Sequence, residues 1–197
     1  MAKPIDIHSQ DNLRPIQAPT PFSRWGMDHT GPVRHNGQVA YLCTEIEYAT
    51  SYGMARLTRS PDSTSYLEII RQTRVLFGIK KTITDNGKPF QSKDMELYCT
   101  DNQITQSTTI PYRPQTNGKV ERFNGILKTI FHAVSSANLS RSPQWILDQA
   151  LNIHNRRPNS TGYSLIFLAL GVIPEEPTEE YQRESTPVEE VAFAADV

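Results

Sequence analysis

Five short stretches of the chain are rich in β-branched and aromatic residues, and residues that favour turns separate them. They predict strands at residues 24–33, 38–48, 51–57, 80–84 and 104–108. The first three follow one another directly, with turn residues at positions 35–37 between the first and the second. This arrangement predicts an antiparallel meander at the start of the fold.

Helices are expected between and after the later strands, at residues 61–77, 91–102, from 119 onward, 143–155 and 164–170. The first of them has a candidate N-cap in Ser60, a proline at the first helical position in Pro61, and a stop signal in Gly78. Three strands followed by alternating helices and strands predict an α/β fold with a mixed five-stranded sheet that carries helices.

The helix that begins after Gly118 has the clearest periodicity. Its apolar residues recur at steps of three and four, which places them on one side of the helix, toward the core. They are Val120, Phe123, Leu127, Ile130 and Val134. A neighbouring face carries Glu121, Asn124 and Lys128, so this helix is expected to present polar side chains beside its buried face.

The two ends of the chain differ from its middle. Four prolines and no sustained apolar period predict an extended lead-in over residues 1–21. Residues 174–197 are rich in proline and glutamate and predict a disordered acidic tail. The folded core is therefore expected at residues 22–173.

Charge is unevenly distributed along the chain. The acidic tail has eight acidic residues and one arginine, so the other 173 residues, with 19 basic and 13 acidic side chains, have a net charge of +6, although the whole chain is at −1. A basic body suits a polyanionic partner such as nucleic acid. No apolar run is long enough to cross a bilayer and the first residues lack a secretory signal, so an intracellular protein without a membrane partner is expected.

The two cysteines, Cys43 and Cys99, fall in a predicted strand and a predicted helix, which favours buried free thiols over a disulfide framework. The sequence contains neither a Cys-x-x-Cys nor a His-x-x-x-His pair. No structural zinc is therefore expected.

Three acids stand where the predicted elements could bring them together. Asp28 lies within the first strand, Asp85 directly follows the fourth, and Glu121 lies in the first turn of the long helix, whose N-terminus favours negative charge. Phosphodiester chemistry uses two divalent ions about 3.5–4 Å apart, and Mg²⁺ prefers carboxylate oxygens. The three acids are therefore candidate metal ligands, and solvated surface acids are the alternative interpretation.

The residues around these acids resemble the integrases of gypsy-type LTR retrotransposons, which belong to the D,D-35-E superfamily of integrases and transposases. The run Trp-Gly-Met-Asp-His-Thr-Gly-Pro is similar to the first catalytic strand, Thr-Asp-Asn-Gly to the segment of the second aspartate, and Pro-Tyr-Arg-Pro-Gln-Thr-Asn-Gly-Lys-Val-Glu-Arg-Phe-Asn to the catalytic loop and glutamate helix. These runs are residues 25–32, 84–87 and 111–124. Between Asp85 and Glu121 lie 35 residues, the spacing that names the class. The resemblance covers residues 14–171.

The resemblance implies an RNase H-like fold, a mixed five-stranded sheet with helices on both faces. It also implies metal-dependent endonuclease and nucleotidyl transferase activity, in which water trims a transposon DNA end and the freed 3′-hydroxyl attacks a target phosphodiester. Asp28 and Asp85 would hold and bridge two Mg²⁺ or Mn²⁺ ions, and Glu121 would complete one or both sites. DNA ends and target DNA as partners, a homo-oligomer and a nuclear location are implied in the same way.

DNA contacts are implied for residues that flank these acids. Tyr112, Gln115 and Asn117 stand in the loop before the long helix, and Lys128 matches a lysine with which the family contacts DNA. Two further cations on the helix are candidates, with a solvated helix face as an equally weighted alternative. They are Lys119 and Arg122.

Three neighbouring residues are interpreted as structural. His29 alternates with Asp28 along the strand, so it is expected to point to the opposite face of the sheet as a packed or surface histidine. Glu45 and Glu47 are interpreted as an ordinary charged edge. The sequence departs from the family at Arg113, where histidine is frequent.

Three alternatives stay open. An RNase H would use Glu68 as the acid between Asp28 and Asp85. Bacterial insertion-sequence transposases share the loop before Glu121, but the Trp-Gly-Met-Asp opening favours the retrotransposon side. The third alternative is a catalytically silent remnant that binds DNA or protein, against which the intact set of three acids argues. Neither a zinc module before the core nor a chromodomain or small β-barrel after it is recognisable, and full integration would depend on such modules.

Overall fold

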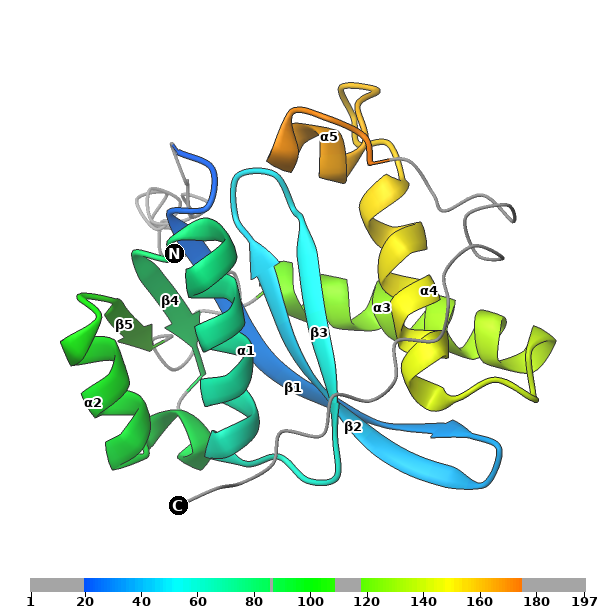
Figure 1. Ribbon diagram of the computed structural model, residues 1–197, viewed down its shortest axis with the longest axis horizontal. Helices are drawn as coiled ribbons and strands as arrows, with labels where there is room; N and C mark the ends of the chain where they lie inside the picture. The colour runs from blue at the N-terminus through cyan, green and yellow to red at the C-terminus, as the bar shows by residue number, and fades with distance from the viewer. Residues whose placement is uncertain (1–19, 86, 109–117, 175–197) are drawn as a thin grey trace, which may run out of the picture.

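The computed structural model describes residues 20–174, apart from residue 86 and residues 109–117. At its centre is a five-stranded sheet with the order β3-β2-β1-β4-β5 (Figure 1). The strands are β1 (Arg24–His35), β2 (Gln38–Glu47), β3 (Gly53–Thr58), β4 (Lys81–Thr84) and β5 (Thr105–Thr108). β1 to β3 pair in antiparallel fashion, whereas β4 pairs in parallel with both β1 and β5. The predicted meander and mixed sheet are confirmed.

Helices cover both faces of this sheet (Figure 1). The described helices are α1 (Ser63–Phe77), the 3₁₀ helix η2 (Lys88–Gln91), α2 (Lys93–Asp101), α3 (Gly118–Ala137), α4 (Pro143–Arg156) and α5 (Leu165–Leu170). On one face, Trp25 and Met27 of β1 pack with residues of α1 and α2. On the other, Leu42 and Ile46 of β2 pack with residues of α3 and α4. Because both faces are covered, the central strands are buried on both sides.

The side chains that cap the helices determine where they begin. α1 starts at Ser63 rather than at Pro61, because Asp62 and not Ser60 is its N-cap: the backbone N of Ser65 donates to Asp62 Oδ1 over 2.8 Å. The Ser60 hydroxyl instead donates to the Asp62 carboxylate. Gly78 ends the helix in the left-handed conformation, as predicted.

The predicted stripe on α3 is confirmed. Val120, Phe123 and Leu127 are buried, and Ile130 and Val134 pack against them. The remaining element bounds differ from the predicted ones by a few residues at most, as is usual for helix and strand ends.

Both cysteines are buried and carry free thiols, in agreement with the sequence. Among the helices of the described ranges, none combines the length and the apolar character needed to cross a membrane. The predicted lead-in up to residue 19 and the predicted acidic tail from residue 175 lie outside the described residues.

Candidate active site

The parallel pairing of β1 and β4 brings two of the three acids together. Gly26 pairs with Ile83 at the end of the ladder. Continuing this register by two residues places Asp28 opposite Asp85, and neighbouring strands run about 4.7–4.9 Å apart. The two carboxylates therefore leave the sheet side by side, at the point where the two strands stop pairing.

α3, the helix that carries the third acid, is joined to β1 by Asn124. Its amide nitrogen donates to Asp28 Oδ2 over 2.8 Å, and its amide oxygen accepts from the Thr44 hydroxyl over 2.7 Å. Asn124 lies one turn after Glu121, on the same side of the helix. The hydrogen bond to Asp28 thus holds the first turns of α3, with Glu121, over β1.

The three charges act on one another. The pKa of Asp28 is raised to about 6, mainly because burial destabilises the carboxylate and also because the charges of Asp85 and Glu121 repel it. The hydrogen bonds from the His29 backbone N, at 2.7 Å, and from Asn124 lower it again. A carboxylate that is destabilised by burial and by like charges is one that a cation stabilises.

Asp85 is oriented by the residue that follows the turn after β4. The backbone N of Gly87 donates to Asp85 Oδ1 over 2.8 Å. A Cβ atom at Gly87 would lie 2.7 Å from the same oxygen, so the missing side chain is what allows this approach. Sequence reasoning missed both this contact and the role of Asn124, although residues 87 and 124 stand inside the motifs that carry the resemblance.

The donor set suits a hard divalent cation, because three carboxylates on three different elements offer only oxygen ligands. Within the described residues, however, no three His, Cys, Asp or Glu side chains already form a group that could hold a metal ion. Glu121 is exposed, while Asp28 and Asp85 are half-buried. The backbone thus brings the elements that carry the acids together, and the charges of Asp85 and Glu121 act on Asp28, but the three side chains do not form a ready set of metal ligands.

The residues predicted to contact DNA divide into three groups. Tyr112, Gln115 and Asn117 lie outside the described residues. Arg122 is exposed and Lys128 is half-buried, both on α3. Lys119 is directed inward, because its ammonium group donates to the backbone carbonyl oxygen of Tyr48.

Two acids were interpreted wrongly. Glu45 and Glu47 are not a charged edge, since both side chains are fully buried. Glu47 accepts from the backbone N atoms of Ala49 and Thr50, at 3.0 and 2.6 Å, and so closes the turn between β2 and β3. Glu45 points toward α1, where the Thr73 hydroxyl donates to it. Because helices cover both faces of β2, the side chains on either face of this strand are buried, whether they are polar or apolar.

Two further interpretations are settled by contacts. The His29 ring packs edge-on against Tyr66 of α1, with the ring centroids 4.2 Å apart, so it lies on the face opposite Asp28 as predicted. Glu68 forms an ion pair with Arg56 of the edge strand β3 over 2.8 Å. This places Glu68 away from Asp28 and Asp85 and argues against an RNase H arrangement.

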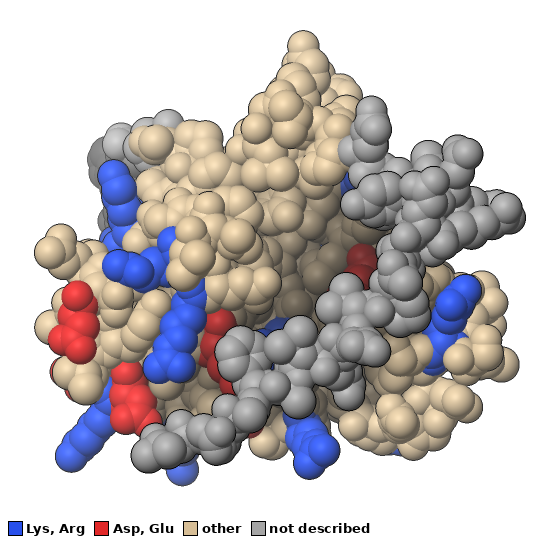
Figure 2. Space-filling view, viewed as in Figure 1, with Lys and Arg blue, Asp and Glu red and all other residues tan. Residues whose placement is uncertain are grey.

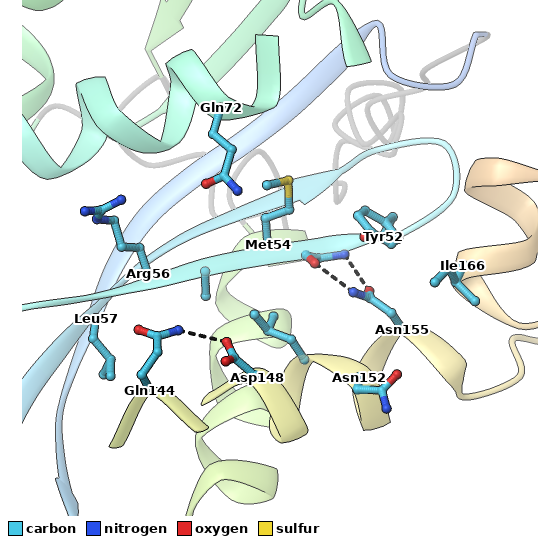
Figure 3. A pocket seen from close by; sticks show the side chains of 13 residues that line it. Tyr52, Met54, Arg56, Leu57, Gln72, Gln144, Asp148, Asn152, Asn155 and Ile166 are labelled. Atoms are coloured by element: carbon cyan, nitrogen blue, oxygen red, sulfur yellow. Dashed lines mark hydrogen bonds between the residues drawn. The ribbon is translucent and has the colours of Figure 1, made fainter. Parts of the chain in front are cut away.

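Two clefts lie elsewhere on the molecule. One of about 560 Å³ lies between β3, α1 and α4 (Figure 3), and another of about 640 Å³ lies beside the β1–β2 hairpin; none of the three acids lines either one. On the face shown in Figure 2, acidic and basic side chains intermingle over α1 and α2, which does not suit a polyanion. The acids, rather than these clefts, are the candidate active site.

Comparison with known proteins agrees with this interpretation. Residues 18–114 match the family model "Integrase core domain". The chain is 26% identical over 170 residues to the Pro-Pol polyprotein of feline foamy virus, which covers 82% of this chain but only 14% of the polyprotein. The chain thus spans about a seventh of that relative.

Solved structures share the fold. A chain of the simian T-cell lymphotropic virus intasome, solved in complex with PP2A regulatory subunit B56 gamma, matches with a TM-score of 0.73 and 25% identity, over 83% of this chain and 61% of that one. The HTLV-2 integrase catalytic core domain, solved with magnesium in a trimeric form, matches with a TM-score of 0.68 and 21% identity, over 78% and 99%. The fold is thus the RNase H-like fold of integrase catalytic cores. Residues 18–114 of the chain thus resemble the integrase core domain in sequence, and the described structure shares the fold of retroviral integrase catalytic cores.

Proposed function

We propose that this chain is the catalytic core of a gypsy-type retrotransposon integrase, a polynucleotidyl transferase that trims DNA 3′ ends and joins them to target DNA. The observation that supports the proposal is the placement of Asp28 on β1 beside the end of β4, with α3 joined to it by Asn124 and with the charges of Asp85 and Glu121 acting on the Asp28 carboxylate. The retrotransposon source rests on the motif around Asp28, because the 35-residue spacing is common to the whole D,D-35-E superfamily.

Asp28, Asp85 and Glu121 would hold two Mg²⁺ or Mn²⁺ ions, and the relative solved with magnesium supports this ion. When bound, such ions activate water and stabilise negative charge on a phosphodiester. The protein itself positions the reactants, since β1, β4 and α3 fix where the carboxylates stand. In both reactions one P–O bond breaks as another forms, with water as the nucleophile in trimming and the DNA 3′-hydroxyl in joining.

DNA would approach along α3, where Arg122 and Lys128 are available for phosphate oxygens. Tyr112, Gln115 and Asn117, in the segment that leads into α3, would contact the DNA end. The relatives solved as dimeric and trimeric forms and as an intasome support a homo-oligomer as the acting form. Integration into a genome requires action in the nucleus.

The test is a labelled duplex that carries the element's DNA end, incubated with Mn²⁺ or Mg²⁺ and either wild-type protein or Glu121→Gln. We expect metal-dependent nicking and joining by the wild type, and a loss of at least about a hundredfold in the variant, because a metal ligand is removed without change of shape. Lys93→Met, on an exposed residue of α2, is the control for nonspecific change.

A core that only binds DNA or protein is the second candidate, and one observation favours it: the described carboxylates do not form a finished metal-binding group. DNA binding by the wild type without cleavage under either metal would support this candidate and exclude the first. Cleavage confined to the RNA strand of an RNA–DNA hybrid would point to RNase H activity instead.

A further inference from the structure

The first turn of a helix is its least supported part, because its first four backbone N–H groups have no partner within the helix. In α3 this turn carries Glu121, which is exposed. Asn124 holds the helix on the C-terminal side of Glu121 by its bond to Asp28. The position of Glu121 therefore depends on what holds the helix on the N-terminal side.

Lys119 makes that second contact. Its ammonium group donates to the backbone carbonyl oxygen of Tyr48 and lies 5.5 Å from the centroid of the Tyr48 ring. A hydrogen bond from a charged donor combined with a cation–π contact is stronger than either contact between neutral groups. We call this pair of contacts the α3 anchor.

The residues on the far side of the anchor are held by hydrogen bonds of their own. The backbone N of Tyr48 donates to the Arg24 carbonyl at the start of β1 over 3.0 Å. The turn that follows is closed by the buried Glu47 carboxylate through Ala49 and Thr50. The anchor thus joins α3 to a part of the sheet that has little freedom of its own.

The anchor also lies close to the acids. The Tyr48 ring covers Gly26, where a Cβ atom would be only 2.9 Å from the ring. Gly26 is two residues before Asp28 and therefore on the same face of β1. Lys119 consequently contacts Tyr48, directly after β2, and Asn124 contacts Asp28 of β1, so both hold α3 to adjoining parts of the sheet, with Glu121 between them in sequence.

From these contacts we infer that Lys119 is a positioning residue, which fixes the first turn of α3 so that Glu121 stays over Asp28 and Asp85, and that it is not a ligand of DNA phosphate. The inference rests on the proposed function, because the purpose of the position is the metal site. The inference gives Lys119 a different role from Arg122, its exposed neighbour on the same turn, which is available for DNA phosphate.

The test compares Lys119→Met, Lys119→Arg and Arg122→Met, with Lys93→Met as the control for the loss of one positive charge. Amide hydrogen exchange of residues 122–124, whose N–H groups are the first in α3 with partners within the helix, is measured in the metal-free protein, together with Mn²⁺ affinity. For Lys119→Met we expect exchange of these amides about tenfold faster and Mn²⁺ binding about tenfold weaker, with an unchanged melting temperature of the whole domain. Lys119→Arg retains the charged donor and is expected to restore most of both losses.

DNA binding distinguishes positioning from phosphate contact. We expect Lys119→Met to leave the slope of log affinity against log salt concentration unchanged, and Arg122→Met to reduce it by about one phosphate contact. A reduced slope for Lys119→Met, with unchanged exchange and Mn²⁺ affinity, would overturn the inference. An absence of cleavage by the wild type would defeat the proposed function alone, because the exchange and salt measurements need no catalysis.

Discussion

The orientation of the Asp85 carboxylate depends on the size of residue 87. Gly87 has φ −62° and ψ 142°, a conformation that alanine adopts without strain, but its added Cβ would stand 2.7 Å from Asp85 Oδ1. Gly87→Ala should therefore displace the carboxylate rather than the backbone. We expect metal-dependent DNA cleavage to fall about tenfold or more, with the free energy of unfolding changed by less than about 1 kcal/mol.

Cleavage rates under Mn²⁺ and urea unfolding curves measure the two effects separately. Asp85→Asn provides the lower limit of activity for comparison. Cleavage by Gly87→Ala at the wild-type rate would mean that the Cβ atom added at residue 87 does not displace the Asp85 carboxylate.

The role of a single residue could be proposed from the sequence where a motif surrounds the residue. It could not be where the role depends only on whether the side chain is buried. Asp28 and Asp85 were singled out from their neighbours in sequence, and their role as metal ligands stays a prediction. Glu45 and Glu47 were misinterpreted, because an acid in a strand looks the same from the sequence whether its face is solvated or covered by α1. The role of Asn124 depends on a contact across 96 residues, for which no local pattern exists.

Among the elements, the edge strand β3 packs closely against α3 and α4 at Gly53, where there is no room for a side chain. The Asn155 side chain of α4 donates to the Gly53 carbonyl and accepts from the Gly53 N–H, at 2.9 and 2.8 Å (Figure 3). A Cβ atom on Gly53 would lie 2.5 Å from the Phe123 ring of α3. Gly53→Ala should destabilise the domain by about 1–3 kcal/mol through overpacking.

The matched control is the same substitution at Gly125, on the exposed side of α3, where an added Cβ meets nothing within 4 Å. Gly125→Ala should stabilise the domain by about 0.5–1 kcal/mol, because glycine is costly inside a helix. Urea unfolding of the two variants should therefore show shifts of opposite sign. Equal shifts would contradict the crowding at Gly53.

Element type and order were predicted correctly from periodicity, and element starts less well. The start of α1 was placed two residues early because Ser60, Pro61 and Asp62 all carry N-terminal signals. Only the three-dimensional course of the chain shows that Asp62 accepts the bond from Ser65. Competing caps of this kind are not resolved by sequence alone.

For the molecule as a whole, the free energy of unfolding depends on pH through a carboxyl group that lies away from the acids of the site. This group is buried because helices cover the sheet. Glu45 is fully buried between β2 and α1, and burial raises its pKa to about 8, against a lowering by the hydrogen bond from Thr73. In the unfolded chain its pKa is close to 4.5. Between these two values the folded protein keeps a proton that the unfolded chain has lost, so this group makes stability decrease as pH rises.

Glu45→Gln replaces the carboxyl by a neutral amide of nearly the same shape and removes this contribution. The stability of the variant relative to the wild type should therefore increase steadily from pH 5 to pH 8 in urea unfolding of the metal-free proteins. Asp28, with a raised pKa, and His154, with a lowered one, also titrate with folding, but they are present in both proteins and cancel in the difference. Two parallel pH curves would mean that Glu45 is ionised in the folded protein, and burial would then not control its protonation.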